Sequence, residues 1–142
     1  MRVTEANTEL EDAFRRLVPQ LTPNSPPPTQ THLASLVADP SSTLMIAREP
    51  DVGGRIVGSA SLAIYRVPTG VRAIIEDVVV DGSFRGRGIG RALLTRLLEE
   101  GRAAGAAGVT LTSNPERADA TRLYLRLGFS RRNTNAYFYR FG

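Results

Sequence analysis

The sequence contains no cysteine and no lysine, and its only histidine is His32. Without cysteine, disulfides, thiolate nucleophiles and cysteine-ligated zinc or iron–sulfur centres are excluded. A single histidine excludes a multi-histidine metal site and leaves one base for a Ser-His-Asp triad. The absence of lysine excludes phosphate-loop NTPases and Schiff-base chemistry. We therefore expect an activity that uses no metal.

Long hydrophobic runs are also missing. No stretch approaches the roughly 18 consecutive apolar residues that a membrane-spanning helix needs. The first 14 residues carry four acidic side chains at positions where a signal peptide would have an apolar run. These features predict a cytoplasmic protein with no membrane partner.

The chain has 142 residues, of which 42% are apolar and 23% charged. This length suits one domain over residues 1–142, which can fold without disulfides or a structural metal. All 18 basic residues are arginine, and the net charge is +4. The positive charge indicates an anionic partner, and the candidates are nucleic acid, lipid headgroups and a phosphorylated ligand.

Hydrophobic periodicity predicts an α/β (α+β) fold. Residues 71–80 are the most β-branched run and are expected to form a central strand, and a helix with a clear apolar face begins at Ile89. Hairpin strands come early and two crossover helices late, so we expect a mixed, mostly antiparallel sheet of six to seven strands with helices on both faces. The other expected elements are strands at 2–5, 43–48, 55–67, 109–112, 129–132 and 134–141, and helices at 8–18, 29–38 and 117–127.

The most informative segment spans residues 75–94, where a β-branched strand leads into a loop rich in glycine and arginine. Alternating glycines let a ligand approach the backbone closely, because they carry no Cβ. The helix that follows presents unpaired N–H groups with about half a positive charge at its N-terminus. The pattern predicts a phosphate or pyrophosphate cradle formed by Arg85, Gly86, Arg87, Gly88, Ile89, Gly90 and Arg91.

Three interpretations of this segment compete. A plain glycine-rich turn requires fewer glycines and arginines than this helix start carries. A dinucleotide-binding fingerprint requires G-x-G-x-x-G, but the third position is Arg91 when counted from Gly86 and Leu93 when counted from Gly88. The third interpretation is a resemblance to a known family.

Arg85-x-x-Gly88-x-Gly90 resembles the acyl-CoA pyrophosphate loop of the GNAT superfamily of N-acetyltransferases, whose pattern is Gln/Arg-x-x-Gly-x-Gly/Ala. Downstream, Leu123-Tyr124-Leu-Arg-Leu-Gly128-Phe129 is similar to the family's Leu-Tyr-x-x-x-Gly-Phe signature. One helix and one strand separate the two motifs, as in the family. The resemblance is residue-specific over 75–129 and extends along the chain in the order of the elements.

One position departs from the family pattern. Family members often carry an asparagine seven residues before the signature tyrosine, where it contacts the CoA arm. Here that position is Arg117, and the nearest asparagine is Asn114. Whether either residue replaces this contact is left open.

The resemblance implies an enzyme that transfers an acetyl group from acetyl-CoA to a primary amine. With no cysteine there is no evident acyl-enzyme nucleophile, so direct attack by the amine is the simpler scheme. The resemblance makes Tyr124 the general acid for the leaving thiolate, although its helical spacing alone would make it a core residue. It also places the donors to the thioester oxygen in the backbone N–H groups of Val78, Val79 and Val80.

For the base that deprotonates the amine, we favour Glu76, acting directly or through a water. In a regular strand Glu76, Val78 and Val80 share one face and Asp77 points to the other. A β-bulge would shift this parity. The structural alternative for either carboxylate is a pair with one of the many arginines.

The acceptor is expected to be a small-molecule or peptide amine, and residues 75–80 resemble the matching strand of glucosamine-6-phosphate N-acetyltransferases without fixing that substrate. Sheet edges in such folds often pair, which makes a homodimer a candidate assembly. Two other functions compete with the enzyme. The basic, aromatic stretch 131–141 is typical of a nucleic-acid-binding surface, although nucleic acid is not the favoured partner. A non-catalytic CoA-binding regulatory module is the other alternative.

Overall fold

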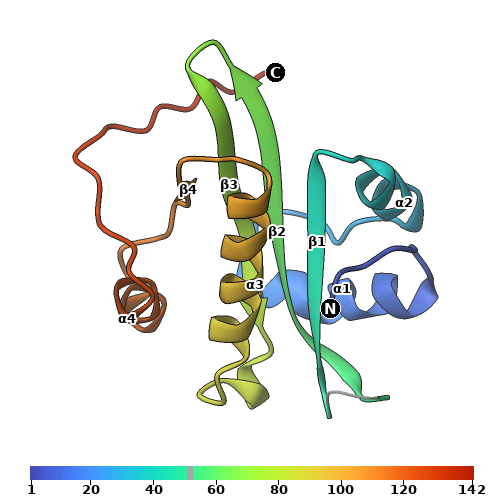
Figure 1. Ribbon diagram of the computed structural model, residues 1–142. Helices are drawn as coiled ribbons and strands as arrows, with labels where there is room; N and C mark the ends of the chain where they lie inside the picture. The colour runs from blue at the N-terminus through green and yellow to red at the C-terminus, as the bar shows by residue number, and fades with distance from the viewer. Residues whose placement is uncertain (51–52) are drawn as a thin grey trace. The chain divides into compact units, whose positions relative to one another are not determined.

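The computed structural model describes residues 1–50 and 53–142, which form two compact units, Met1–Thr112 and Ser113–Gly142. The strands of the described chain all lie in the first unit, together with α1, α2 and α3, and the second unit contains α4 (Figure 1). The single domain over residues 1–142 stays a prediction.

The first unit is built on a four-stranded sheet in the order β1-β2-β3-β4. Strands β1 (Ser42–Glu49), β2 (Arg55–Val67) and β3 (Gly70–Val80) form an antiparallel meander, and β4 (Val109–Thr110) pairs parallel to β3. The mixed, mostly antiparallel sheet is confirmed. The expected six to seven strands are not, because the described residues supply four.

The missing strands lie at the two ends of the chain. Residues 2–5 contribute only an isolated bridge between Arg2 and Met45, and residues 129–142 form neither helix nor strand. The prediction of closing strands at 129–132 and 134–141 is therefore wrong. The aromatic side chains of residues 137–141 favour a strand locally, but a strand also needs a partner edge, and residues 129–142 pair with no strand of the described chain.

Helices cover both faces of this sheet, as predicted. Helices α1 (Thr8–Leu21) and α2 (Gln30–Ala38) pack on one face, where the core contains Leu10, Ala13, Leu17, Leu33, Leu44, Ile46, Ile56 and Val79. Helix α3 (Ile89–Ala103) crosses the other face (Figure 1). Gly58 of β2 allows its close approach, because a Cβ there would lie 3.1 Å from Cγ2 of Ile89.

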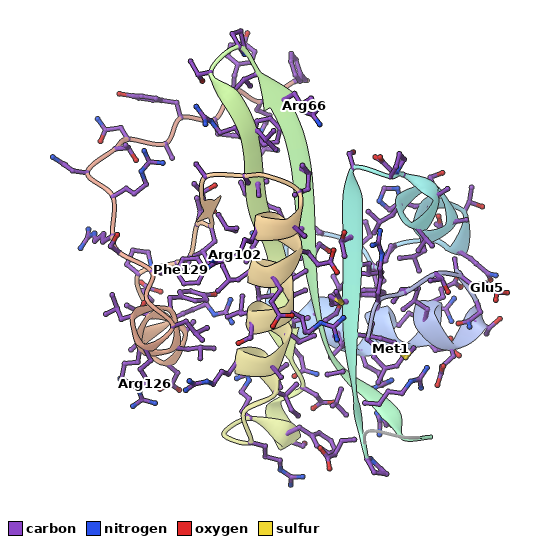
Figure 2. All side chains as sticks on the ribbon, in the orientation of Figure 1. Met1, Glu5, Arg66, Arg102, Arg126 and Phe129 are labelled. Atoms are coloured by element: carbon purple, nitrogen blue, oxygen red, sulfur yellow. The ribbon has the colours of Figure 1, made fainter. Side chains whose placement is uncertain are left out.

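The second unit contains α4 (Ala118–Arg126) and the segment that follows it. Gly128 ends this helix with a φ of +98°, and the N–H groups of Gly128 and Phe129 donate to the carbonyls of Leu125 and Tyr124. This pair of bonds is a Schellman motif, which only a residue tolerant of positive φ closes without strain. Phe129 thereby returns to the helix (Figure 2). Its ring packs edge-on against the ring of Tyr124, with 5.9 Å between the two ring centroids.

Candidate active site

A β-bulge interrupts β3 beside the predicted base. Ser61 of β2 pairs with Glu76 and Ser59 pairs with Val79, so that Asp77 and Val78 together lie opposite Ala60. Asp77 adopts a φ of +53°, the only positive value among the non-glycine residues described. Aspartate is one of the few residues that tolerate this conformation, which places an extra residue in one strand.

The bulge changes which residues share a face. Val79 packs in the core beneath α1, and Val80 pairs with Gly58, which faces α3. Glu76 pairs with Ser61, two residues from the partner of Val79, and so lies on the face of Val79. The expectation that Glu76 shares a face with Val78 and Val80 is therefore wrong, because it assumed a regular strand.

Glu76 is exposed and forms no ion pair with any arginine in the described parts of the chain. The paired-carboxylate alternative is thus not what the structure shows. Partial desolvation and the neighbouring carboxylate of Asp77 raise the pKa of Glu76. A raised pKa brings a carboxylate nearer to the range in which a general base works best at neutral pH.

One edge of β3 is open next to this bulge. The pairing with β4 is confined to Ala73 and Ile74, whereas the pairing with β2 continues to Val80. Within the described chain, no strand pairs with the β4-side edge of β3 beyond Ile74. Backbone N–H and C=O groups along that edge are available to a ligand, because an unpaired strand edge carries free donors and acceptors.

The glycine-rich loop ends at the start of α3, where Gly88 is the N-cap with a φ of +80°. Gly88 carries no side chain to cap the helix, and the first turn contains no acidic residue. A Cβ at Gly86 or Gly88 would meet nothing within 4 Å, so open space surrounds both residues. The first N–H groups of α3 therefore remain available to an anion.

Three exposed arginines surround this helix start. Arg85 donates from Nε to the carbonyl of Val80 at 3.2 Å, and the guanidinium of Arg87 lies 5.0 Å from the ring centre of Phe84. Across residues 1–50 and 53–142, neither these two nor Arg91 forms an ion pair with a carboxylate. The positive charge here is not neutralised by the protein, which suits a phosphate or pyrophosphate ligand.

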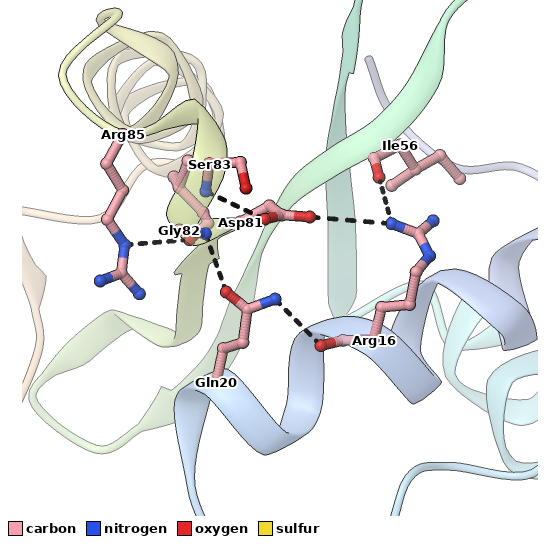
Figure 3. Close-up of polar contacts among 8 residues, drawn as sticks. Arg16, Gln20, Ile56, Asp81, Gly82, Ser83 and Arg85 are labelled. Carbon is pink, nitrogen blue, oxygen red and sulfur yellow. Dashed lines mark hydrogen bonds and ion pairs between the residues drawn. The ribbon is translucent and has the colours of Figure 1, made fainter.

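Two residues of α1 that the sequence did not single out contact the beginning of this loop (Figure 3). Gln20 accepts a hydrogen bond from the N–H of Gly82, and Arg16 lies beside Asp81. The predicted helix stopped at Val18, yet α1 continues through Pro19 to Leu21. The i, i+4 spacing of Arg16 and Gln20 indicates a shared helix face only once the helix is known to include both.

Tyr124 lies in the second unit, where its ring is buried with an exposed fraction of 8%. Its hydroxyl has no hydrogen-bond partner in the described chain, and it is not among fully enclosed unpaired atoms, so solvent reaches it. Burial raises the pKa of the Tyr124 phenol, and the positive charge of Arg117 acts in the opposite direction. The phenol therefore holds its proton at neutral pH, as a general acid must.

The two residues considered for the CoA-arm contact differ in their surroundings. The side-chain oxygen of Asn114 accepts a hydrogen bond from the N–H of Glu116 at 3.0 Å. Arg117 is the N-cap residue of α4 and makes no side-chain capping bond. The side-chain oxygen of Asn114 is thus already hydrogen-bonded within the protein, whereas the side chain of Arg117 forms no capping bond to its helix.

The described residues contain no group of three or more His, Asp or Glu side chains placed to hold a metal ion. Within the same residues, no helix combines the length and the apolar character needed to cross a membrane.

The chain matches the Acetyltransferase (GNAT) family over residues 7–129. Glucosamine 6-phosphate N-acetyltransferase from Trypanosoma brucei brucei is 48% identical over 79 residues, which cover 54% of this chain and 52% of that protein. Glucosamine 6-phosphate N-acetyltransferase 1 from Oryza sativa subsp. japonica is 33% identical over 135 residues, which cover 88% of this chain and 78% of that protein. A crystal structure of an acetyltransferase from Trypanosoma brucei is 33% identical, with a TM-score of 0.73 over 94% of this chain and 96% of that one.

The chain therefore belongs to the GNAT acetyltransferase family. Members of this family use acetyl-CoA as co-substrate. The prediction of a GNAT N-acetyltransferase is confirmed at the level of the family, which favours an enzyme over the nucleic-acid-binding alternative. The match to the trypanosomal glucosamine 6-phosphate enzyme spans about half of that protein's length, 52%.

Proposed function

We propose that this protein transfers the acetyl group of acetyl-CoA to the primary amine of a phosphorylated amino sugar, with glucosamine 6-phosphate as the first candidate. One observation carries the CoA part of the proposal: α3 begins at an uncapped Gly88 without an acidic residue in its first turn. The charge of three unpaired arginines falls at the same helix start. The relatives named for glucosamine 6-phosphate support the acceptor.

In this proposal the diphosphate of acetyl-CoA binds at the start of α3. The N–H groups of the helix donate to its oxygens, and Arg85, Arg87 and Arg91 neutralise its charge. The pantetheine amides pair with the open edge of β3 beyond Ile74, as a strand would. The backbone N–H groups of Val78, Val79 and Val80 are the candidates that bind the thioester oxygen as it gains negative charge.

The chemistry requires two proton movements. The acceptor must attack as a neutral amine, and we assign Glu76 to accept the proton that the nitrogen loses, directly or through a water. The amine nitrogen then bonds to the thioester carbon, and the carbon–sulfur bond breaks. We assign Tyr124 to protonate the departing thiolate, in keeping with the family signature in which it stands. The products are an N-acetyl compound and free CoA.

The cradle is tested by two variants, Arg85→Ala and Gly88→Ala. Each should weaken acetyl-CoA binding by about tenfold, the first because a charged hydrogen-bond donor is lost and the second because alanine resists a φ of +80°. Isothermal titration calorimetry at low and high salt separates the two causes, since salt screens only the charge. Arg96→Ala, on the same helix, is the control and should bind normally. Unchanged affinity in both variants would remove the cradle assignment.

The reaction itself is tested with the wild-type chain and a panel of primary amines, by following the release of free thiol from acetyl-CoA. We expect turnover with glucosamine 6-phosphate and a higher KM for glucosamine, because the relatives that support this acceptor are named for the phosphorylated sugar. Acetyl-CoA binding without turnover on any amine would favour the non-catalytic CoA-binding module. A salt-dependent interaction with random DNA and none with CoA would favour the nucleic-acid-binding alternative.

A further inference from the structure

We propose that Gln20 and Arg16 of α1 are positioning residues for the acetyl-CoA loop, and that they set the affinity for the co-substrate without contacting it. This inference rests on the proposed function, because it assumes that the loop between β3 and α3 binds acetyl-CoA. The evidence is a set of polar contacts between α1 and residues 81–83, which begin that loop (Figure 3).

Gln20 makes the most direct contact. Its Oε1 accepts a hydrogen bond from the backbone N–H of Gly82 at 2.8 Å, across 62 residues of sequence. Its Nε2 donates to the carbonyl of Arg16 at 3.1 Å, which fixes the orientation of the amide. A neutral side chain on one helix is thus bonded to the backbone of the loop, and its own conformation is held by a second bond.

Arg16 supports the same place from the neighbouring turn. Its Nη1 donates to the carbonyl of Ile56 at 3.2 Å and lies 4.0 Å from Oδ2 of Asp81. The backbone N–H of Asp81 donates to the carbonyl of Val57 at 2.8 Å, and Oδ1 of Asp81 accepts from the N–H of Ser83. Asp81 therefore connects β2, α1 and the short 3-10 turn Gly82–Phe84.

The remainder of the loop has much weaker support. The N–H of Phe84 donates to the carbonyl of Asp81 at 2.8 Å and Nε of Arg85 donates to the carbonyl of Val80 at 3.2 Å. Beyond Arg85, the next backbone bond is the one from Ala92 N–H to the carbonyl of Gly88 at 3.0 Å, and a Cβ at Gly86 or Gly88 would meet nothing within 4 Å. The segment from Gly86 to Gly88 is thus held from its two ends, by the contacts of residues 81–85 on one side and by α3 on the other. Glycines add conformational freedom between these ends, so the position of Arg87 depends on both anchors.

The expected effect is on binding more than on stability. Gly82 is exposed, so water can replace Gln20 as the acceptor, and the protein loses little stability when the side chain is removed. The loop loses a fixed position, and ordering it again costs affinity. We expect Gln20→Ala to raise the Kd and the KM for acetyl-CoA by about two- to tenfold, the range of one net hydrogen bond, with kcat unchanged.

The experiment measures acetyl-CoA binding by calorimetry, KM and kcat by thiol release, and Tm, on the full chain. Gln20→Ala and Arg16→Gln are the test variants, and Gln20→Glu is the rescue variant because it keeps an acceptor oxygen for Gly82. Arg15→Gln is the matched control, since Arg15 adjoins Arg16 and its ion pairs within the described chain are with Glu11 and Asp12. The affinity lost in Gln20→Ala should not depend on salt, because glutamine carries no charge.

Weaker acetyl-CoA binding in both test variants, with normal kcat, a Tm within about 3 °C of wild type and a normal Arg15→Gln, supports the inference. Wild-type affinity in Gln20→Ala and Arg16→Gln would overturn it. So would losses of affinity that follow losses of Tm, because they would indicate a purely structural role. If the wild-type chain itself fails to bind acetyl-CoA, the proposed function fails, and the inference fails with it.

Discussion

Replacing Glu76 by glutamine is expected to lower kcat by about 100-fold or more while leaving acetyl-CoA binding intact. The amide has nearly the shape of the carboxylate but cannot accept the proton of the amine. In the wild type, the acidic limb of the kcat profile should lie above the ordinary glutamate pKa of about 4.3, because desolvation and Asp77 raise the pKa of Glu76. Steady-state kinetics from pH 5 to pH 10 should show that this limb is lost in Glu76→Gln.

Asp77→Asn is the matched control, since it makes the same chemical change one residue away. Asparagine also tolerates the φ of +53° that the bulge requires, so the strand should keep its shape. A wild-type kcat and acidic limb in Glu76→Gln would contradict the assignment. An equal or larger loss in Asp77→Asn would transfer the role of base to Asp77.

The Glu76→Gln variant should not lower the stability of the fold. A carboxyl whose pKa is higher in the folded protein than in the unfolded chain destabilises the fold once it is ionised. The free energy of unfolding therefore falls as the pH rises from the pKa of the unfolded chain to that of the folded protein. Glu76 also has no stabilising ion pair in the described chain. Thermal unfolding of Glu76→Gln at pH 7 should therefore give a Tm at or slightly above the wild-type value, and the difference should vanish at low pH.

Tyr124→Phe is expected to lower kcat by about 100-fold, because the thiolate then leaves without a proton. Stability should change little, since the substitution keeps the buried ring and its edge-on contact with Phe129. The hydroxyl that is removed has no protein partner in the described residues. Thiol release under saturating substrates and thermal unfolding, measured on the same preparation, separate the two effects.

Tyr65→Phe provides the comparison for Tyr124→Phe, because Tyr65 lies on β2 with an exposed fraction of 48%. It should leave both kcat and Tm at their wild-type values. If Tyr124→Phe keeps full kcat, then Tyr124 is a core residue, as its helical spacing alone would suggest. If it lowers kcat and Tm together, the acid role is likewise unsupported.

Elements with strong local patterns were predictable from the sequence. The β-branched run of β3 and the apolar face of α3 each depend on side chains within one segment, and Gly128 ends α4 where expected. The closing strands were not predictable, because a strand needs a partner edge as well as β-forming residues. The side chains of Tyr137 and Phe141 are each 91% exposed, so the strand propensity of these aromatic residues does not by itself produce a strand.

The candidate loop could be recognised from the sequence, whereas the side-chain directions along β3 depend on its pairing register and could not. Alternating glycines and arginines before an amphipathic helix located the candidate cradle. The bulge at Asp77 arises from the pairing of β3 with β2, which no single strand encodes, so the face occupied by Glu76 was assigned wrongly. Gln20 escaped notice because its contact with Gly82 joins residues far apart in the sequence.

The exclusive use of arginine has a practical consequence for any assay of this protein. An acyl donor reacts with a neutral, nucleophilic nitrogen. The guanidinium of arginine does not react in this way, because it stays protonated and its charge is delocalised. The 142 residues therefore offer no ε-amine to be acetylated, in contrast to a lysine-bearing transferase that can label itself. Radioactivity transferred from labelled acetyl-CoA should accumulate on the added compound, with little background on protein side chains. Lysine-directed crosslinkers will likewise leave the side chains of this chain unmodified.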